Sequence, residues 1–283
     1  DTPEGSIQLR SNARTYFSRG VQVELDLQVE VGSVHHDVTF GIRLHEDEED
    51  RLQRNSSYHQ QAGALVLDDV GLLGNAGNRV QQAEALALHV YDRITLGEWV
   101  LTPGVRHEKI DQSRVRYEIR SGRTLIPESR ASSNIRDQRQ NKTRVWLPGI
   151  GVLYAVNNNL TAVGGVHKGF TAPSNAPGVN EETAINWELG LRHFSPRFST
   201  ELMLFYSDYD NLLGECTASS GSDCAVGDAF NGDAASVLGV EFAIAGNLYE
   251  SINVTVPLSF NYTYINSEFD SNIADTDFFG SVN

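Results

Sequence analysis

Three arginines share one local pattern and could bind an anion. Each follows a glycine and an apolar residue, in the triplets Gly41-Ile42-Arg43, Gly104-Val105-Arg106 and Gly190-Leu191-Arg192. On a β-strand the glycine and the arginine then point to the same face, where the glycine leaves room for a packed group. A guanidinium group offers a rigid fork of donors for a carboxylate. We therefore predict Arg43, Arg106 and Arg192 as ligand-binding residues; alternatively, wall acids such as Glu108 and Glu188 hold them in structural ion pairs.

Other clusters of polar side chains make poor sites. His35-His36 are adjacent, so on a strand they point to opposite faces and cannot share a metal ion well. The run Asp208-Tyr209-Asp210-Asn211 lacks the glycine and the terminal glutamate of a calcium loop. The aspartates between 270 and 277 favour a solvated loop over a weak calcium site. We find no nucleophile elbow, P-loop or dinucleotide fingerprint, and we expect no enzymatic activity, no metal and no cofactor.

The two cysteines indicate a disulfide. Cys216 and Cys224 lie close together in a segment rich in Gly, Ser, Asp and Ala. This spacing fits a small disulfide loop formed in an oxidising compartment. Seven intervening residues and the lack of a nearby histidine do not match a zinc knuckle. Two free thiols remain the alternative.

The elements that would position these residues are β-strands. From Val21 to Val31 every odd position is apolar, and every even position between them is polar or acidic. A similar alternation returns between Ile252 and Tyr264. Each such strand has one apolar face and one wet face. Because the wet face of these long strands includes carboxylates, the pattern indicates a sheet between lipid and a water-filled lumen.

The connections between the predicted strands alternate in length. Short turns such as Leu96-Gly97-Glu98 lie at one end. Long polar connections at 47–79, 112–141, 171–182, 213–235 and 267–277 would lie at the other. This asymmetry is typical of an outer-membrane barrel and uncommon in a compact soluble domain. The predicted strands are 7–16, 20–31, 36–46, 80–96, 98–111, 142–156, 159–170, 183–194, 198–212, 236–246, 251–266 and a truncated one from 278.

Two aromatic residues agree with a membrane-spanning strand. Trp146 and Tyr154 are eight residues apart on the same face of the strand predicted at 142–156. That separation is about 26 Å along a strand and about 20 Å in height once the strand is tilted. It approaches the height of the apolar band that aromatic girdles flank in barrels. Two core aromatics of a soluble sheet would be the alternative.

The composition narrows the classes of partner. The 283 residues carry a net charge of −15, with a pI near 4.9, which argues against a nucleic-acid partner. The mean hydropathy is −0.31, and no apolar run is long enough for a membrane-spanning helix. We also find no N-terminal signal segment. Barrel strands escape a hydropathy scan because half of their residues face water.

Several blocks occur in an order that resembles a known family. The first is Ala85–Asp92 with Leu96–Glu108, and the second is Leu147–Tyr154 with Val166–Ser174. The third is Asn186–Arg192, Phe205–Leu212, Phe230–Gly232 and Gly239–Glu241. Together they resemble the β-barrel of TonB-dependent outer-membrane receptors, above all the ferric-citrate and siderophore receptor branch. The resemblance extends from about Arg19 to Phe279.

This resemblance implies an all-β fold and an uptake function. Such receptors are antiparallel 22-stranded transmembrane β-barrels, occluded by an N-terminal plug domain. They bind a ferric chelate, ferric citrate or a siderophore, and import it with energy relayed by TonB. We expect residues 1–283 to be one partial barrel domain, an internal fragment with about half of the strands and without plug or TonB box. The implied setting is the outer membrane of a Gram-negative bacterium, in contact with lipid and lipopolysaccharide, as a monomer.

Two rival interpretations belong to other classes. One is a plugless passive porin-type barrel, which shares the strand pattern. The other is a soluble extracellular β-protein that binds or hydrolyses glycans. A glycoside hydrolase would need a pair of converging carboxylates, which the sequence does not reveal.

Overall fold

β-Strands make up most of the described chain. The computed structural model describes residues 6–118, 130–173, 175–217 and 227–270. The only helical element among them is a single 3-10 turn, η1 (Ser132–Asn134). No helix in these ranges has the length and hydropathy needed to cross a membrane. The strands are β1 (Ser6–Ser11), β2 (Arg14–Val31), β3 (Val34–Gln61), β4 (Ala64–Asp69), β5 (Gly77–Leu96), β6 (Trp99–Tyr117), β7 (Ile135–Asn157), β8 (Leu160–Thr171), β9 (Glu182–Phe194), β10 (Phe198–Asp210), β11 (Leu213–Glu215), β12 (Ala229–Asn231), β13 (Ala235–Glu250) and β14 (Thr255–Phe269).

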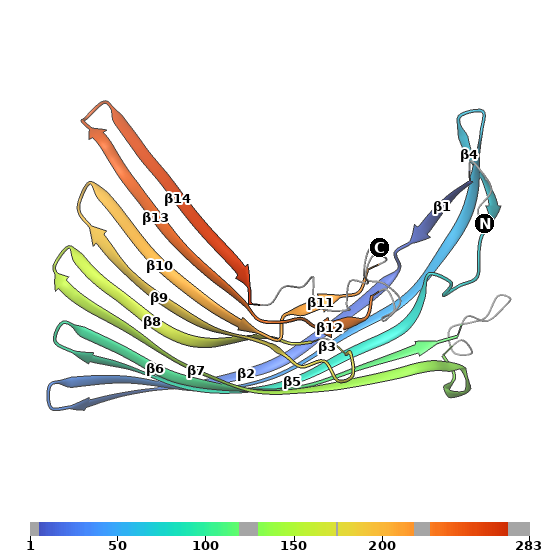
Figure 1. Ribbon diagram of the computed structural model, residues 1–283, viewed down its shortest axis with the longest axis horizontal. Coiled ribbons are helices and arrows are strands. Elements are labelled where there is room, and N and C mark those ends of the chain that lie inside the picture. Colours follow the sequence, from blue (N-terminus) through green and yellow to red (C-terminus); the bar gives the residue numbers. More distant parts are fainter. Residues whose placement is uncertain (1–5, 119–129, 174, 218–226, 271–283) are drawn as a thin grey trace.

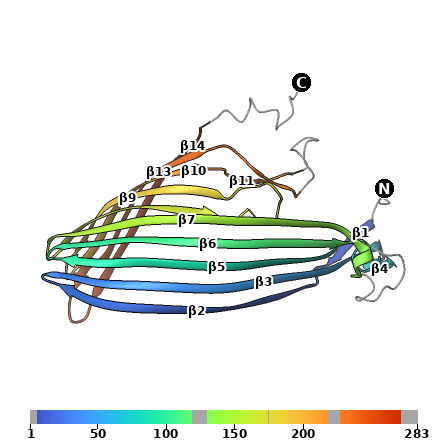
Figure 2. The same cartoon turned by 90° about the horizontal axis from the view of Figure 1, so that it is seen from below.

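The strands form one curved antiparallel sheet (Figure 1). Ten strands follow one another across it, in the order β2, β3, β5, β6, β7, β8, β9, β10, β13 and β14. β1 and β4 pair with the far end of β3, and β11 and β12 form a separate small hairpin. The short turns between the strands that span the sheet gather at one end, on the left of Figure 1, whereas the longer connections and the β3–β4 turn lie at the other end. Within the described residues, β2 and β14 stay apart, so the sheet is open (Figure 2).

Several predicted loops are in fact strand. The connection predicted at 47–79 is largely strand, because β3 continues to Gln61 and returns through β4. The connection predicted at 112–141 shrinks to 118–134. Beyond the apolar band both faces of a strand are wet, so the sequence loses its alternation while the backbone pairing continues. The predicted gap at 17–19 is also wrong, since the break lies at 12–13. The strand predicted from 278 lies outside the described residues.

The apolar faces of the strands combine into one surface. One cross-strand row runs through Val23, Ile42, Leu88, His107 and Trp146. Trp146 is 63% exposed, whereas its neighbours on the opposite face of β7, Thr143 and Val145, are buried. The apolar face is therefore the convex one, and the polar face lines the hollow. So large an exposed apolar surface requires lipid or a partner to cover it.

Aromatic pairs mark both ends of this band. Trp99 and Tyr154 lie 4.4 Å apart between ring centroids near the short turns. His107 and Trp146 lie 4.5 Å apart near the middle of β6 and β7, further toward the long connections. On both β6 and β7 the two pairs are eight residues apart. Beyond the second pair, the next outward residues are charged, Lys109 and Arg144. The apolar band thus ends at the His107–Trp146 pair on these strands.

Candidate anion-binding site

The concave face carries a cluster of arginines at the end of the sheet that holds the long connections. The residues come from β2, β3, β5, β6 and β7, where these strands extend past the apolar band. Two neighbouring cross-strand rows hold them, because the register aligns one residue from each strand. The outer row is Arg14, Arg51, Arg79, Arg116 and Asp137; the inner row is Tyr16, Glu49, Gln81, Arg114 and Arg139.

The cluster lies beyond the membrane-spanning part of its strands. Leu86 is the last residue of the outward apolar run on β5. At about 3.3 Å per residue, Arg79 lies roughly 23 Å further along the strand. On β7 the outward residues at this level are Gln138 and Gln140. The arginines therefore lie beyond the apolar band, at a level where the outward side chains are polar as well.

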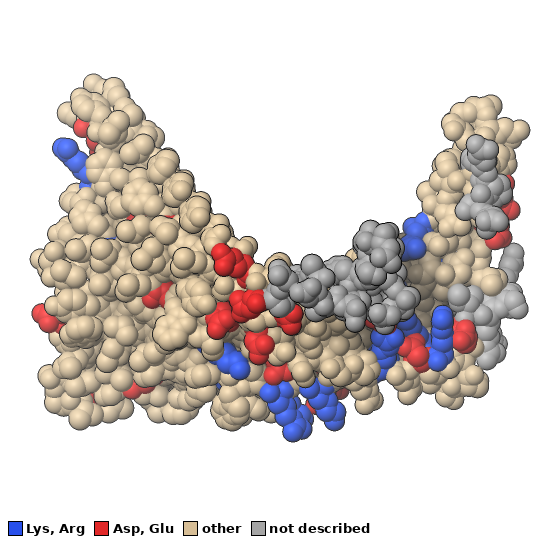
Figure 3. Space-filling view, in the orientation of Figure 1, with Lys and Arg blue, Asp and Glu red and all other residues tan. Residues whose placement is uncertain are grey.

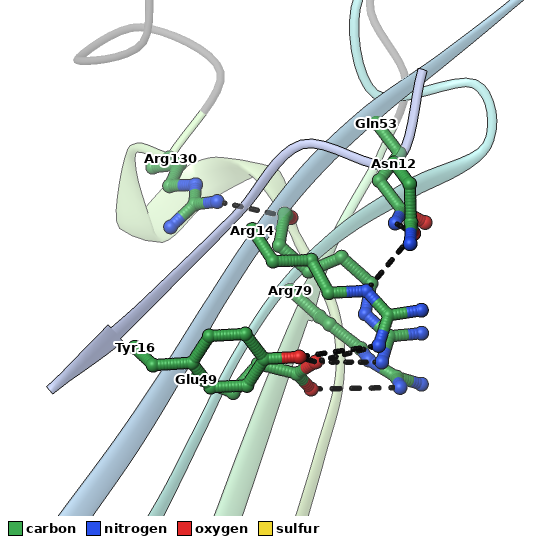
Figure 4. Close-up of polar contacts among 8 residues, drawn as sticks. Asn12, Arg14, Tyr16, Glu49, Gln53, Arg79 and Arg130 are labelled. Atoms are coloured by element: carbon green, nitrogen blue, oxygen red, sulfur yellow. Dashed lines mark hydrogen bonds and ion pairs between the residues drawn. The ribbon is translucent and has the colours of Figure 1, made fainter. Parts of the chain in front are cut away.

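Glu49 is the centre of one half of the cluster (Figure 4). Its carboxylate lies 2.7 Å from Arg51 Nη2, 3.4 Å from Arg14 Nη1 and 3.9 Å from Arg79 Nη2. The Tyr16 hydroxyl donates to Glu49 Oε1 at 3.2 Å and accepts from Arg14 Nη1 at the same distance. One carboxylate thus faces three guanidinium groups.

Asp137 is the centre of the other half. Arg114 Nη2 donates to Asp137 Oδ2 at 3.2 Å, and Arg139 Nε lies 3.4 Å from the same atom. Arg116 Nε lies 4.0 Å from Asp137 Oδ1. Arg139 also donates to Asp228, which precedes β12, at 2.8 Å. The connection between β10 and β13 therefore reaches across the hollow to β7, and a carboxylate already occupies one guanidinium group of the cluster.

Burial and, after it, the crowding of like charges lower the pKa of two arginines in the cluster. Burial, together with Arg51, Arg116 and Arg114, lowers the pKa of Arg79 to about 10, despite the opposing charge of Glu49. Burial and the neighbouring Arg116 and Arg139 also lower the pKa of Arg114. Both groups stay protonated at neutral pH. A bound anion would relieve the repulsion that these shifts report.

The cluster has spare charge and spare donors. Six arginines face the three carboxylates of Glu49, Asp137 and Asp228 in the described part of the chain. The buried Nε atoms of Arg51, Arg79 and Arg114 have no hydrogen-bond partner there. Guanidinium groups in this arrangement can bind a ligand with several carboxylates or other anionic oxygens. Arg130, by contrast, pairs with Asp50 and lies outside the cluster.

The three arginines predicted from the sequence lie deeper in the hollow, and the structure brings two of them to one common space. Arg43 and Arg106 both line an open hollow of about 840 Å³. Arg106 donates to Glu108 at 2.5 Å, and Arg43 donates to His45 Nδ1 at 3.2 Å.

Arg192 lies apart from them. It is two residues from the end of β9, near the short turns. There it makes a two-point contact with Glu201, at 3.0 and 3.3 Å. This geometry favours a structural ion pair for Arg192 over ligand binding. The partner is Glu201, whereas the acid named from the sequence was Glu188. Ligand binding by Arg43, Arg106 and Arg192 stays a prediction.

The glycines of the triplets have a role within the sheet. A Cβ atom added at Gly41 would collide with the His89 ring, and one at Gly190 would collide with Met203. The room that each glycine leaves is therefore filled by a side chain of the neighbouring strand.

One cysteine of the predicted disulfide, Cys216, lies in the described part of the chain. Cys216 is 1% exposed, just after β11, and its backbone pairs with Asp228 and Gly227. Cys224 lies outside the described residues, so its pairing with Cys216 stays a prediction.

Sequence reasoning missed the arginine cluster because it placed most of these residues in loops. Without a strand, no face could be assigned to Arg51, Arg79 or Arg116. A signal was present, since Arg114-Val115-Arg116 continues the alternation of β6 with arginine on the inward positions.

The comparisons with known proteins agree with this architecture. The family model described as "TonB dependent receptor-like, beta-barrel" matches residues 2–281. No curated protein sequence matches the chain. Among solved structures, the unliganded ferric citrate transporter FecA superposes with a TM-score of 0.68 at 20% identity, covering 95% of this chain and 38% of FecA.

Two further structures are similar. The siderophore receptor PiuA from Acinetobacter baumannii gives a TM-score of 0.66 at 14% identity, covering 95% of this chain and 41% of PiuA. The ferric-catecholate import receptor Fiu from E. coli K12, in its closed form, gives 0.63 at 14% identity, covering 92% and 39%. The chain thus spans about two fifths of these receptors. The predicted partial antiparallel barrel is confirmed, and the chain belongs to the family of TonB-dependent receptor β-barrels.

Proposed function

We propose that this chain forms part of the wall of an outer-membrane receptor that takes up an anionic ferric chelate, such as ferric citrate or a carboxylate siderophore. The observation that carries the proposal is the arginine cluster, with six guanidinium groups against three carboxylates and buried donors that lack partners. An overall acidic chain concentrates positive charge on one inward surface, at the end where the long connections lie. Such a surface attracts and orients an anion.

The receptor would bind and move its ligand without changing it. We infer capture at the cluster in a Gram-negative outer membrane, followed by import with energy relayed by TonB. Arg43 and Arg106 would offer a second set of cationic contacts deeper in the hollow, on the way to the short turns. The family assignment and the fold support this sequence of events.

Binding of iron-55 citrate to the full-length receptor in outer-membrane vesicles tests the proposal. Arg79 and Arg116 are the best residues to replace, since their nearest carboxylates lie at 3.9 and 4.0 Å and little structure depends on them. We expect Arg79→Gln with Arg116→Gln to weaken binding by about 10- to 100-fold for each guanidinium group removed.

Arg192→Gln is the control for each single replacement, because it removes one guanidinium charge near the short turns. It should leave affinity within about twofold. Unchanged affinity in the Arg79/Arg116 double variant would remove the cluster from the capture site. Equal weakening by Arg192→Gln would mean that general charge, and not the cluster, attracts the chelate.

A further inference from the structure

We propose that the convex face of the barrel holds a phosphate-bearing lipid headgroup at an outer cationic patch formed by Lys109, Lys142 and Arg144. The patch lies on β6 and β7, directly beyond the aromatic pair that ends the apolar band. All three side chains point away from the hollow, on the same face as Trp146. Figure 3 shows Lys and Arg side chains projecting from the convex side of the sheet.

The charges of the patch are incompletely neutralised within the protein. Lys109 lies directly opposite Arg144 in the register, and such like-charged pairs destabilise a sheet. Asp111 is shared, since Lys109 Nζ lies 3.2 Å and Lys142 Nζ 3.7 Å from its carboxylate. Arg144 has no ion pair or hydrogen bond from its side chain to any described residue, and it is exposed. The incompletely neutralised charge of Lys109 and Arg144 therefore favours the binding of an anion from outside the protein.

The neighbouring strands differ at the same level. Arg19 lies in the same cross-strand row as Lys142, but Glu46 holds it at 2.6 Å. Glu84, in the next position of that row, is an exposed acid. On β10 the outward residue beyond Tyr206 is Asp208. On β8 the outward residue beyond Val166 is Lys168, so apart from Arg19 and its partner Glu46 the outward cations at this boundary lie on the neighbouring strands β6, β7 and β8 of the described chain.

The position of the patch next to the apolar band favours a lipid as its ligand. Directly below the patch, the His107–Trp146 pair lies where amphipathic rings meet lipid headgroups, and the apolar band below it would contact the acyl chains. Lysine and arginine next to an apolar band attract anionic lipid, by about 1 kcal/mol each, or about fivefold in affinity. A phosphorylated lipid can satisfy the cations and the band together, whereas a free phosphate satisfies the cations alone.

Native mass spectrometry of the full-length receptor with lipid A tests the proposal, with dephosphorylated lipid A as the matched ligand. We expect the wild-type receptor to retain the phosphorylated form. The triple variant K109Q/K142Q/R144Q should lose about fivefold in retention for each cation removed. The control Arg19→Gln, in the same row, should retain it. Equal retention by the triple variant, or equal loss in Arg19→Gln, would overturn the proposal.

A second measurement uses the wild-type receptor and so does not depend on the folding of a variant. Phosphorylated lipid A should protect Lys109 and Lys142 from an amine-labelling reagent, whereas the dephosphorylated form should not. The absence of protection, or equal protection by millimolar inorganic phosphate, would refute a lipid site.

Discussion

At Glu49, burial and charge act on the carboxyl group in opposite directions. Burial alone would raise its pKa, but the hydrogen bond and charge of Arg51, with Tyr16 and Arg79, outweigh burial and hold the pKa below its usual value. The ionised form therefore stabilises the fold above the unfolded-state pKa, near 4.3. That contribution is lost as the pH falls through the lower pKa of the folded state.

Glu49→Gln should lower the free energy of unfolding of the full-length receptor by about 1–3 kcal/mol at pH 7, because three guanidinium groups lose their shared partner. The difference from wild type should disappear at an acidic pH below the lowered pKa of the folded state, where the wild-type carboxyl is protonated as well. Denaturant unfolding at the two pH values measures both effects. Glu201→Gln breaks a more exposed pair and should cost less than about 1 kcal/mol. An equal loss at both pH values would refute this electrostatic account.

Replacing Arg79 should affect the stability of the fold and the binding of the ligand differently. Its lowered pKa means that the folded state disfavours the charged form, so this guanidinium group destabilises the fold at neutral pH. We expect Arg79→Gln to keep or raise the free energy of unfolding while it weakens binding of the ferric chelate. The same chemical denaturation and iron-55 binding assays report the two quantities. A loss of both together would indicate a structural role.

The residues of the site were only partly predictable. The Gly-x-Arg triplets identified inward arginines correctly, because the alternation around them assigns a face. The sequence offered Glu108 as a possible structural partner, and Arg106 does contact it, but it did not identify Glu201 as the partner of Arg192, because that contact depends on the register of β9 and β10. To predict the arginine cluster, one would need to know the register of five paired strands.

At the scale of the element, each long strand has two parts, one with an apolar outward face and one with polar residues on both faces. Between the aromatic pairs the alternation is strong, and there the predicted strands match those observed. Above the band, β3, β6 and β7 continue with polar residues on both faces, and there the sequence predicted loops over most of their length. Backbone hydrogen bonds do not need an apolar side chain. The strands therefore stay paired beyond the region where the apolar–polar alternation of the sequence predicts them.

The depth of each outward position should set the cost of a charge. Ile150 lies midway between Trp146 and Tyr154 on β7 and is 41% exposed on the convex face. Ile150→Arg should cost roughly 2–4 kcal/mol in reversible unfolding from lipid vesicles. Gln140→Arg, outward on the same strand but above the band, should cost less than about 1 kcal/mol. Equal costs at the two positions would contradict the assigned band.

At the scale of the whole molecule, the open sheet has a consequence for how it can exist in a membrane. Within the described residues, the outer edges of β2 and β14 leave backbone groups without strand partners. In a bilayer such groups must be paired, because no water reaches them. The apolar convex face favours insertion, but the edges oppose it until further strands close the barrel.

We therefore expect the 283-residue chain on its own to associate edge to edge when it is refolded into vesicles, because exposed edges template pairing with another chain. Cross-linking through single cysteines placed on β2 and β14 should capture links between chains, in a background with Cys216 and Cys224 replaced. A cysteine at Ser199, on the interior strand β10, is the matched control and should give no such links. A chain that inserts as a stable monomer, with its β2 and β14 amides protected from hydrogen exchange, would show that these edges close without additional strands.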